Sequence, residues 1–468
     1  MAIFGFQLCF TLIMACFLQK LMPLFSFGRW LLCNGTLVRY KHPHDDELKK
    51  LAKKPVEKVN GKGRHRRNQQ PTEEKTFKVP RNIEISLEAE KINPVDVVVL
   101  RSYPDYEWLV DYSVFVMFVY VGTEVYYELW GPEREFNISM IWVGLSVWFA
   151  VKNMISILWL YASSKGGEIS MSITFGMISF LCGLCVLMIK EDILEFGITS
   201  INMTQHNSTM VNQQFSLSGL KLLLAGFGAL HGLLIAFPAI RMSQMYLHSL
   251  KYAKGNNLLN LTLHFNFFAP LVIMFLWVKP LARDIMVGPS LLTNEQFEIF
   301  RIIFILLACV LRLCLTRVHL QAYLNLAFDK LNKIKKESGL ITNIELQRTI
   351  AHVFYYLGIV AMQYLSPLVL LLCSTLCLKS LGGFSWKQVS TNYVQNIPSS
   401  NVTSANVSQD STFVEMVSSF NSGLHDITDV FTIELLRGVC SFIAWWVSTN
   451  WFIASCLGLL YHSYLVGS

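Results

Sequence analysis

Eight of the ionisable residues within the apolar segments of this sequence are the candidates for chemistry inside a membrane. They are Asp111, Glu124, Lys152, Lys221, His231, His264, Arg301 and Arg312. A charge in hydrocarbon costs a few kcal/mol even on lenient scales, so each such residue requires a partner or a function. Three uses are open to this set: ion pairs between helices, a pocket for an anion or an anionic lipid headgroup, and a proton or cation pathway.

The short motifs of known catalytic sites are absent from the sequence. It contains no P-loop, no H-E-x-x-H and no G-x-S-x-G, and its carboxylates lack metal-ligand spacing. A TVGYG-like potassium filter is absent too, and the arginines near residue 312 do not repeat every third position as in a voltage sensor. We therefore expect no catalytic residue, no metal site and no cofactor.

The composition indicates that lipid is the main solvent of this chain. Of its 468 residues, 53% are hydrophobic and only 15% are charged, whereas soluble domains carry about 25% charged residues. This composition excludes a soluble enzyme, a disulfide scaffold, a coiled coil and a disordered chain. The hydropathy rule predicts nine apolar segments, at 2–19, 109–130, 138–161, 170–189, 218–240, 258–279, 299–318, 352–378 and 437–465.

These segments predict an all-α polytopic membrane bundle of about nine transmembrane helices. Residues 1–28 form the first transmembrane helix or a signal-like segment, 29–104 a basic disordered cytosolic loop, and 105–468 the membrane bundle. Within the loop, residues 39–81 hold fourteen Lys and Arg but six Asp and Glu. Such a loop stays in the cytosol near anionic lipid. Its basic run Lys62–Arg67 has no Phe, Tyr or Trp between its cations, so we expect no nucleic-acid partner.

Glycosylation motifs support the same orientation. Alternation from a cytosolic basic loop places the loops 190–217 and 379–436 outside, together with residues 131–137. The predicted outer loops contain five Asn-x-Ser/Thr acceptors, at Asn137, Asn202, Asn207, Asn401 and Asn406. Because two unrelated rules agree, we expect glycan on this side of the membrane.

In this orientation, three of the intramembrane charges lie near the outer ends of their segments. Glu124 is about 9 Å deep at 1.5 Å per residue, and Lys221 and Arg301 lie within about one turn of the outer ends of theirs. We therefore predict that Glu124 packs against Lys221 or Arg301.

The remaining bases lie deeper. Lys152, His231, His264 and Arg312 each fall roughly 20 Å from the outer face, with Asp111 as the nearest acid. They predict a basic layer in the inner half of the bundle, with Lys152 and Arg312 facing its interior. Structural pairing, an anionic-headgroup pocket and a proton or cation pathway remain as alternative interpretations.

Several longer motifs resemble the transmembrane protein 161 family. They include Arg29-Trp-Leu-Leu-Cys-Asn-Gly35, Glu107-Trp-Leu-Val-Asp111, Leu276-Trp-Val-Lys-Pro280 and His319-Leu-Gln-Ala-Tyr-Leu-Asn-Leu-Ala327. The similarity runs from end to end. Arg39-Tyr-Lys-His-Pro43 and Gly382-Gly383 resemble the A-type paralogue more than the B-type.

The resemblance implies a multi-pass glycoprotein of the plasma membrane or endoplasmic reticulum without known catalytic residues. It links the chain to protection against oxidative stress and DNA damage, and to restraint of potassium and calcium currents in cardiac and neuronal cells. Together with the missing catalytic motifs, it favours a non-enzymatic membrane regulator whose partners are membrane lipids, ion channels or other membrane proteins. The alternative is a transporter or channel in its own right with a buried basic layer.

Overall fold

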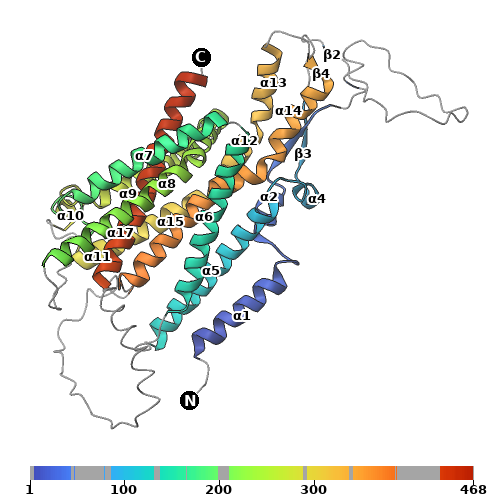
Figure 1. The fold of residues 1–468 in the computed structure, drawn as a ribbon. Coiled ribbons are helices and arrows are strands. Elements are labelled where there is room, and N and C mark those ends of the chain that lie inside the picture. Colours follow the sequence, from blue (N-terminus) through green and yellow to red (C-terminus); the bar gives the residue numbers. More distant parts are fainter. Residues whose placement is uncertain are drawn as a thin grey trace, which may run out of the picture.

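Long apolar helices make up most of the chain (Figure 1). The computed structural model describes residues 5–43, 47, 78–79, 86–130, 137–164, 166–198, 210–287, 292–336, 341–384, 386 and 433–466. In these ranges, eight spans are long and apolar enough to cross a membrane. The predicted all-α polytopic bundle is therefore confirmed.

The eight spans coincide with eight of the nine predicted segments. Their main helices are α5 (Tyr103–Trp130), α6 (Ser139–Ser164), α7 (Gly166–Met188), α8 (Met210–Tyr252), α9 (Asn257–Leu276), α11 (Asn294–Cys314), α15 (Leu357–Leu381) and α17 (Ile433–Tyr461). Two spans are longer than the sequence indicated. Helix α11 continues through α12 (Thr316–Leu324) and α13 (Leu326–Lys336), and α14 (Asn343–Tyr355) leads into α15.

The first predicted segment differs from the others. It forms α1 (Phe6–Leu21), whose 16 residues extend about 24 Å, less than the roughly 30 Å of a hydrocarbon core. The described chain thus has eight helices of membrane length instead of about nine. Helix α1 ends two residues before Pro23, which cannot continue a helix. It packs on α5, where Gln7 Nε2 donates a hydrogen bond to the Tyr127 hydroxyl at 2.9 Å.

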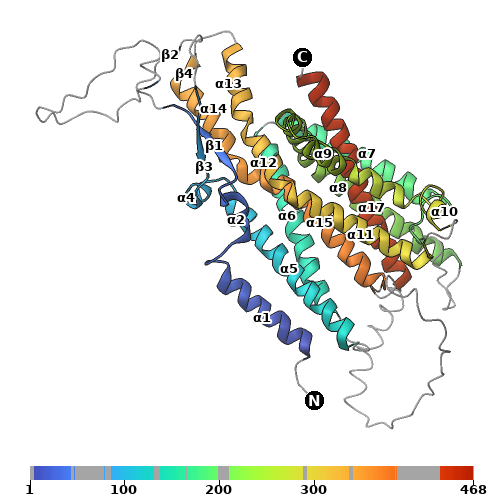
Figure 2. The same cartoon turned by 180° about the vertical axis from the view of Figure 1, so that it is seen from behind.

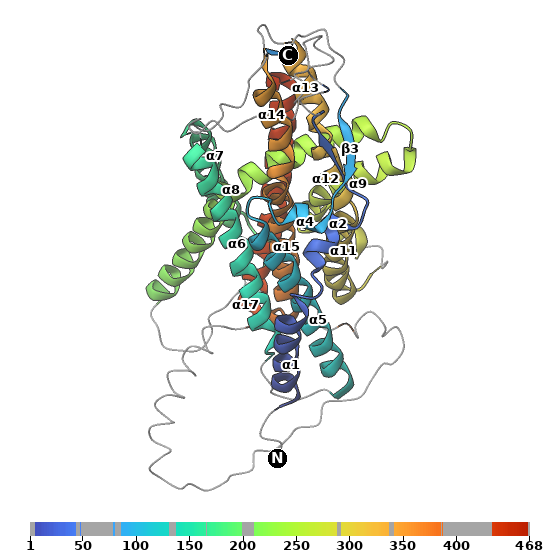
Figure 3. The same ribbon diagram turned by 90° about the vertical axis from the view of Figure 1, so that its right-hand side faces the viewer.

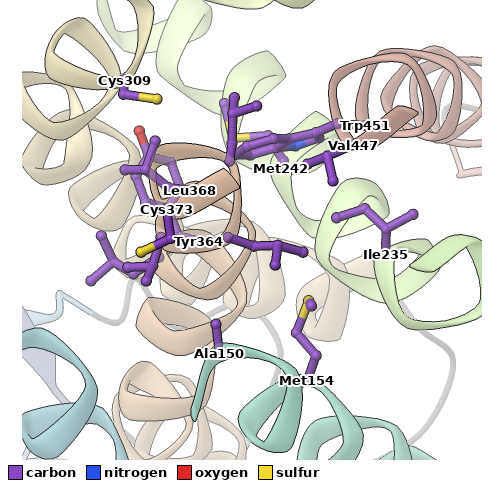
Figure 4. Close-up of a cluster of buried hydrophobic side chains, with 14 of the residues drawn as sticks. Ala150, Met154, Ile235, Met242, Cys309, Tyr364, Leu368, Cys373, Val447 and Trp451 are labelled. Atoms are coloured by element: carbon purple, nitrogen blue, oxygen red, sulfur yellow. The ribbon is translucent and has the colours of Figure 1, made fainter. Parts of the chain in front are cut away.

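Helix α15 lies at the centre of the bundle and is buried over most of its length. It packs against α5, α6, α8, α11 and α17 (Figures 2 and 3). Helix α7 packs mainly against α8. Figure 4 shows part of the resulting core, where Tyr364 and Cys373 of α15 lie near Cys309 of α11 and Trp451 of α17. This core holds the deeper polar residues described below.

Ordered elements occupy both ends of the predicted disordered loop 29–104, which corrects that prediction. Strand β1 (Val38–Lys41) pairs antiparallel with β3 (Glu88–Lys91), and β2 (Lys78–Val79) pairs with β4 (Ile341–Thr342). Helices α2 (Phe27–Cys33) and α4 (Pro94–Val97) flank the first pair. The apolar residues Leu37, Ile92 and Val97 are fully buried here, so the ends of the loop contribute to the core. Residues 44–77 apart from Glu47, and 80–85, lie outside the described residues.

Charged side chains join the two strands of the β1–β3 pair. Arg39 and Lys41 of β1 contact the Glu90 carboxylate of β3 at 2.8 and 2.5 Å. Hydrogen bonds from Lys41 and Arg39 lower the pKa of Glu90 below its usual value. Tyr40 of the same strand donates a hydrogen bond to Asn325 Oδ1 at 3.0 Å, which ties the pair to the α12–α13 junction.

The helices alternate in direction, so the predicted cytosolic connections share one end of the bundle. In Figure 1 this end is the upper one, where α13, α14, the strands and the C-terminus lie. We call it the inner end and the opposite one the outer end. Two short elements complete the fold: α10 (Arg283–Met286) between α9 and α11, and a π-helical turn, η2 (His462–Val466), after α17.

Candidate functional site

Glu124 forms an ion pair with Lys379 of α15, which corrects the predicted pairing with Lys221 or Arg301. The two side chains are only 16% and 8% exposed. Ser380 donates a second hydrogen bond to Glu124 Oε1 at 3.4 Å. The prediction was wrong because it ended the eighth segment at residue 378 and assigned residue 379 to an outer loop. Helix α15 continues to Leu381, so this lysine stays in the bundle.

Arg301 belongs to a separate four-charge cluster at the outer end, made with Glu195, Arg283 and Glu298. Its guanidinium donates to Glu195 Oε2 at 2.8 Å, to Glu298 Oε2 at 2.9 Å and to the Leu276 carbonyl at 2.9 Å. Arg283 contacts both carboxylates as well. Two acids and two bases balance, so the cluster joins α9, α10 and α11 to the segment after α7 without excess charge.

Asp111 holds α2 against α5 at the inner end. Its Oδ1 accepts a hydrogen bond from the Gly28 backbone N–H at 2.9 Å, and Tyr106 donates to the Gly28 carbonyl at 3.1 Å. A carboxylate is favourable beside the first N–H groups of a helix. A Cβ at Gly28 would lie 3.1 Å from Glu107 Cα, so a larger residue here would require α2 and α5 to separate slightly. Asp111 thus has a structural contact, apart from the deeper bases.

The predicted basic layer does not form, because its members face different directions. Lys152 and His264 lie on the exterior of the bundle, where His264 Nδ1 is 2.7 Å from the Tyr246 hydroxyl. His231 is buried, with its Nδ1 3.3 Å from Asn450 Nδ2. The prediction that Lys152 faces the interior was wrong. Lys221, nearer the outer end, is half-buried.

Arg312 does face the interior, as expected, and it is the candidate functional residue of the bundle. The residue is 6% exposed. Its guanidinium lies over Trp451 of α17: its Cζ is 3.4 Å from the centroid of that ring and 5.5 Å from the centroid of the Tyr364 ring of α15. In the described part of the chain it takes part in no ion pair, and its Nε and Nη2 have no hydrogen-bond partner.

A small cavity adjoins this guanidinium. Arg312, Asn266, Pro270, Cys309 and Trp451 contribute to its wall, and its volume is about 10 Å³, which is room for about one water molecule. The Asn266 amide Nδ2 is also without a partner in the structure. Two buried groups therefore offer donors beside one cavity, and an acceptor there would satisfy both.

The backbone around Arg312 is held by Tyr364 and His319. Tyr364 donates a hydrogen bond to the Arg312 carbonyl at 2.7 Å, and His319 Nδ1 lies 2.9 Å from the Leu315 carbonyl. These contacts span the break between α11 and α12. The arrangement fixes a buried cation with free donors, which can bind an acceptor or an anion. It pairs no nucleophile with a base.

Comparison with known proteins decides the family. The family described as "Predicted transmembrane protein 161AB" matches residues 2–466, nearly the whole chain. The chain belongs to this family. The protein is accordingly a multi-pass membrane protein, as the eight apolar spans indicate. No solved structure matches it.

The glycosylation acceptors of this family member lie mostly outside the described residues, which include only Asn137 of the five. Asn137 is half-buried, and its Oδ1 accepts hydrogen bonds from the Ser139 N–H at 3.1 Å and the Ser139 hydroxyl at 2.6 Å. Asn202, Asn207, Asn401 and Asn406 fall in undescribed ranges. Within the described residues, no group of three His, Cys, Asp or Glu side chains could hold a metal ion.

Proposed function

We propose that this member of the transmembrane protein 161AB family is a non-enzymatic regulator that acts through partner membrane proteins. The observation that carries the proposal is the position of Lys152. It lies near the middle of α6 and on the exterior of the bundle. In the described part of the chain it makes no ion pair.

The side chains around Lys152 form an apolar face that is directed toward lipid. Ile141, Leu145, Trp148 and Trp159 are spaced on the same side of α6 and are between 46% and 71% exposed. A lysine on such a face costs a few kcal/mol unless it snorkels or meets an acid. An acidic or strongly polar residue on a partner's transmembrane helix would pair with it. This chemistry favours a regulator that docks within the membrane.

The finer role follows the resemblance described above. We propose that the chain is of the A-type and serves protection against oxidative stress and DNA damage. We also propose that it restrains potassium or calcium currents, with ion channels among its partners, in the plasma membrane or endoplasmic reticulum. The similarity of its motifs to the A-type paralogue supports this assignment.

The test compares whole-cell potassium and calcium currents with and without the protein. Lys152→Met removes the charge, and Lys152→Arg is the matched control that keeps it. At equal surface expression, we expect wild type and Lys152→Arg to reduce the currents and Lys152→Met to reduce them much less. Equal reduction by Lys152→Met would exclude Lys152 as the contact.

A second candidate function is transport or conduction by the chain itself, which the unpaired guanidinium of Arg312 beside Pro270 favours. A cavity of about 10 Å³ does not pass a hydrated ion, so transport would require this region to open. Purified protein in liposomes separates the two functions. The regulator proposal expects no flux of chloride, potassium or calcium without a partner, and robust flux would overturn it.

A further inference from the structure

A large basic cavity lies at the inner end of the bundle, and none of the functions above uses it. Its volume is about 920 Å³, the size of a small-molecule site. Helix α8, the end of α6, the α12–α14 segment, the start of α15 and η2 surround it. Five of its side chains are those of Arg or Lys: Arg241, Lys251, Lys254, Lys330 and Lys333. We call it the inner-end pocket.

The charges of the inner-end pocket are not balanced. Asp329 is the one carboxylate among its described lining residues, and it contacts His248 Nδ1 at 3.1 Å. His352 and His462 add two further titratable bases to the wall. None of the four lysines takes part in an ion pair within the described part of the chain. Gathered cations without counter-charges repel one another, and a bound anion would relieve this repulsion.

The deeper wall of the inner-end pocket holds an arginine whose guanidinium is positioned by neighbouring side chains. Arg241 is half-buried and donates to Gln244 Oε1 at 2.7 Å and to the Tyr161 hydroxyl at 3.3 Å. Its Cζ lies 5.6 Å from the centroid of the buried Tyr323 ring. These contacts fix the guanidinium before any ligand arrives, and a planar guanidinium suits phosphate oxygens. The tyrosines beside it offer flat faces to a ring.

The exposed lysines form the mouth of the inner-end pocket. Lys251 lies in the last turn of α8, Lys254 lies just after that helix, and Lys333 lies on α13; all three are exposed. Two basic walls that face one another bind best to a ligand with more than one negative group. The membrane-length helices α6, α8 and α17 end here, so we expect the mouth to lie at headgroup depth. Basic pockets between membrane helices on the cytosolic side are typical sites for phosphorylated headgroups.

We infer that the inner-end pocket binds a polyol carrying two or more phosphate groups, of the inositol phosphate type. Arg241 holds one phosphate at the deeper wall, and the lysines of α8 and α13 hold the others at the mouth. The ligand can come from the bilayer as a phosphoinositide headgroup or from solution as a free inositol phosphate. The inference goes beyond the proposed regulatory function, because a regulator and a transporter could both carry such a site.

The test uses the purified full-length protein and two matched pairs of substitutions on α13. Lys330→Gln with Lys333→Gln removes two charges from the inner-end pocket. Lys335→Gln with Lys336→Gln removes two charges from the same helix, one turn further on, where the side chains do not line it. Binding of the protein is measured to three targets. They are nanodiscs of phosphatidylcholine alone, nanodiscs that also contain about 5 mol% phosphatidylinositol bisphosphate, and soluble inositol trisphosphate.

We expect the first pair to weaken binding about thirtyfold and the second pair to weaken it by less than about threefold. Binding to the phosphoinositide nanodiscs alone identifies the lipid as the source, whereas tight binding of inositol trisphosphate as well identifies the phosphate ester itself as sufficient. Equal weakening by both pairs, or no binding to either ligand above phosphatidylcholine alone, would overturn the inference.

Asp329→Asn keeps the test decisive if the lysine variants fold poorly. It removes the lone carboxylate, so affinity should rise about fivefold, a gain that misfolding does not produce. An unchanged or reduced affinity in a folded Asp329→Asn protein would contradict the site. The current and flux measurements that test the proposed function do not depend on phosphate binding. The proposed function and the inferred binding site can therefore fail separately.

Discussion

Two buried arginines of α11 should respond in opposite ways to the same substitution. Arg301 and Arg312 are 3% and 6% exposed; Arg301 lies about two turns after the start of the helix and Arg312 lies in its last turn. Arg301 has acceptors for its guanidinium, whereas the Nε and Nη2 of Arg312 have none in the structure. We expect Arg301→Met to lower the free energy of unfolding and Arg312→Met to leave it unchanged or raise it.

The magnitudes follow from the contacts of each guanidinium. Removing one member of a buried pair costs about 3–5 kcal/mol. Glu195 and Glu298 are 25% and 24% exposed and would still contact Arg283 in the variant. We therefore expect Arg301→Met to lower the free energy of unfolding by about 2–3 kcal/mol. Arg312→Met loses a cation–π contact worth about 1–2 kcal/mol. It also removes a buried, unpaired cation, whose desolvation costs several kcal/mol, so the net change is zero or stabilising by about 1–2 kcal/mol.

Unfolding in mixed micelles, followed by tryptophan fluorescence and by size-exclusion chromatography, measures the difference. Both substitutions remove one arginine from one helix and insert the same side chain, so each is the control for the other. The reasoning is refuted if Arg312→Met destabilises the protein as much as Arg301→Met. That result would mean that Arg312 has a structural partner.

Three further outcomes are expected. Glu124→Gln should lower the folded yield, because it leaves the buried Lys379 without its ion-pair partner. The double variant Glu124→Gln with Lys379→Met should recover most of the yield, because it leaves neither charge unpaired, and no recovery would argue against this ion pair. Asp111→Ala removes the acceptor for the Gly28 N–H and should loosen α2 by about 1–2 kcal/mol, as for a lost helix cap. Faster amide exchange at Gly28 would report this, whereas unchanged exchange would contradict the contact. An endoglycosidase shift should vanish when the four acceptors of the two long outer loops are removed, and glycan on Asn34 would reverse the orientation.

The sequence predicted the helices well because membrane solvation imposes a simple rule on them. Twenty or so apolar residues must form a helix that satisfies its own backbone, so hydropathy finds the segment and its approximate depth. The prediction was weakest at the ends. The predicted segment ended at residue 378, whereas α15 continues to Leu381. Lys379 was therefore assigned to a loop, although it lies in α15 and forms the ion pair with Glu124. The short α1 shows the same difficulty, since apolar character alone does not ensure membrane length.

Rotation about the helix axis could not be predicted. Lys152 and Arg312 were expected at similar depth, yet one faces outward from α6 and the other inward from α11. In a membrane both the lipid-facing and the core-facing sides of a helix are apolar, so the pattern that orients a soluble helix is weak. The unpaired state of Arg312 depends on Trp451 and Tyr364 from two distant helices. Such a combination emerges only from tertiary packing.

The contrast between the two ends of the bundle bears on what the excess positive charge does. At the outer end, Glu124, Glu195 and Glu298 each contact a base. At the inner end, five cations share a cavity of about 920 Å³ with one carboxylate. The preference of basic residues for cytosolic loops explains their presence at this end. It does not explain why they surround one cavity whose deeper wall holds an arginine already positioned by tyrosines.

Orientation bias and ligand binding therefore predict different consequences for neighbouring lysines of α13. If only the sign of the charge mattered, Lys330 and Lys333 would be equivalent to Lys335 and Lys336, which carry the same charge on the same helix. If the inner-end pocket is a binding site, only Lys330 and Lys333 affect the affinity for a phosphorylated ligand, whereas all four lysines contribute alike to membrane orientation. Glycosylation mapping of both double variants beside their binding curves separates the two effects, because orientation should be retained in each while affinity falls in one.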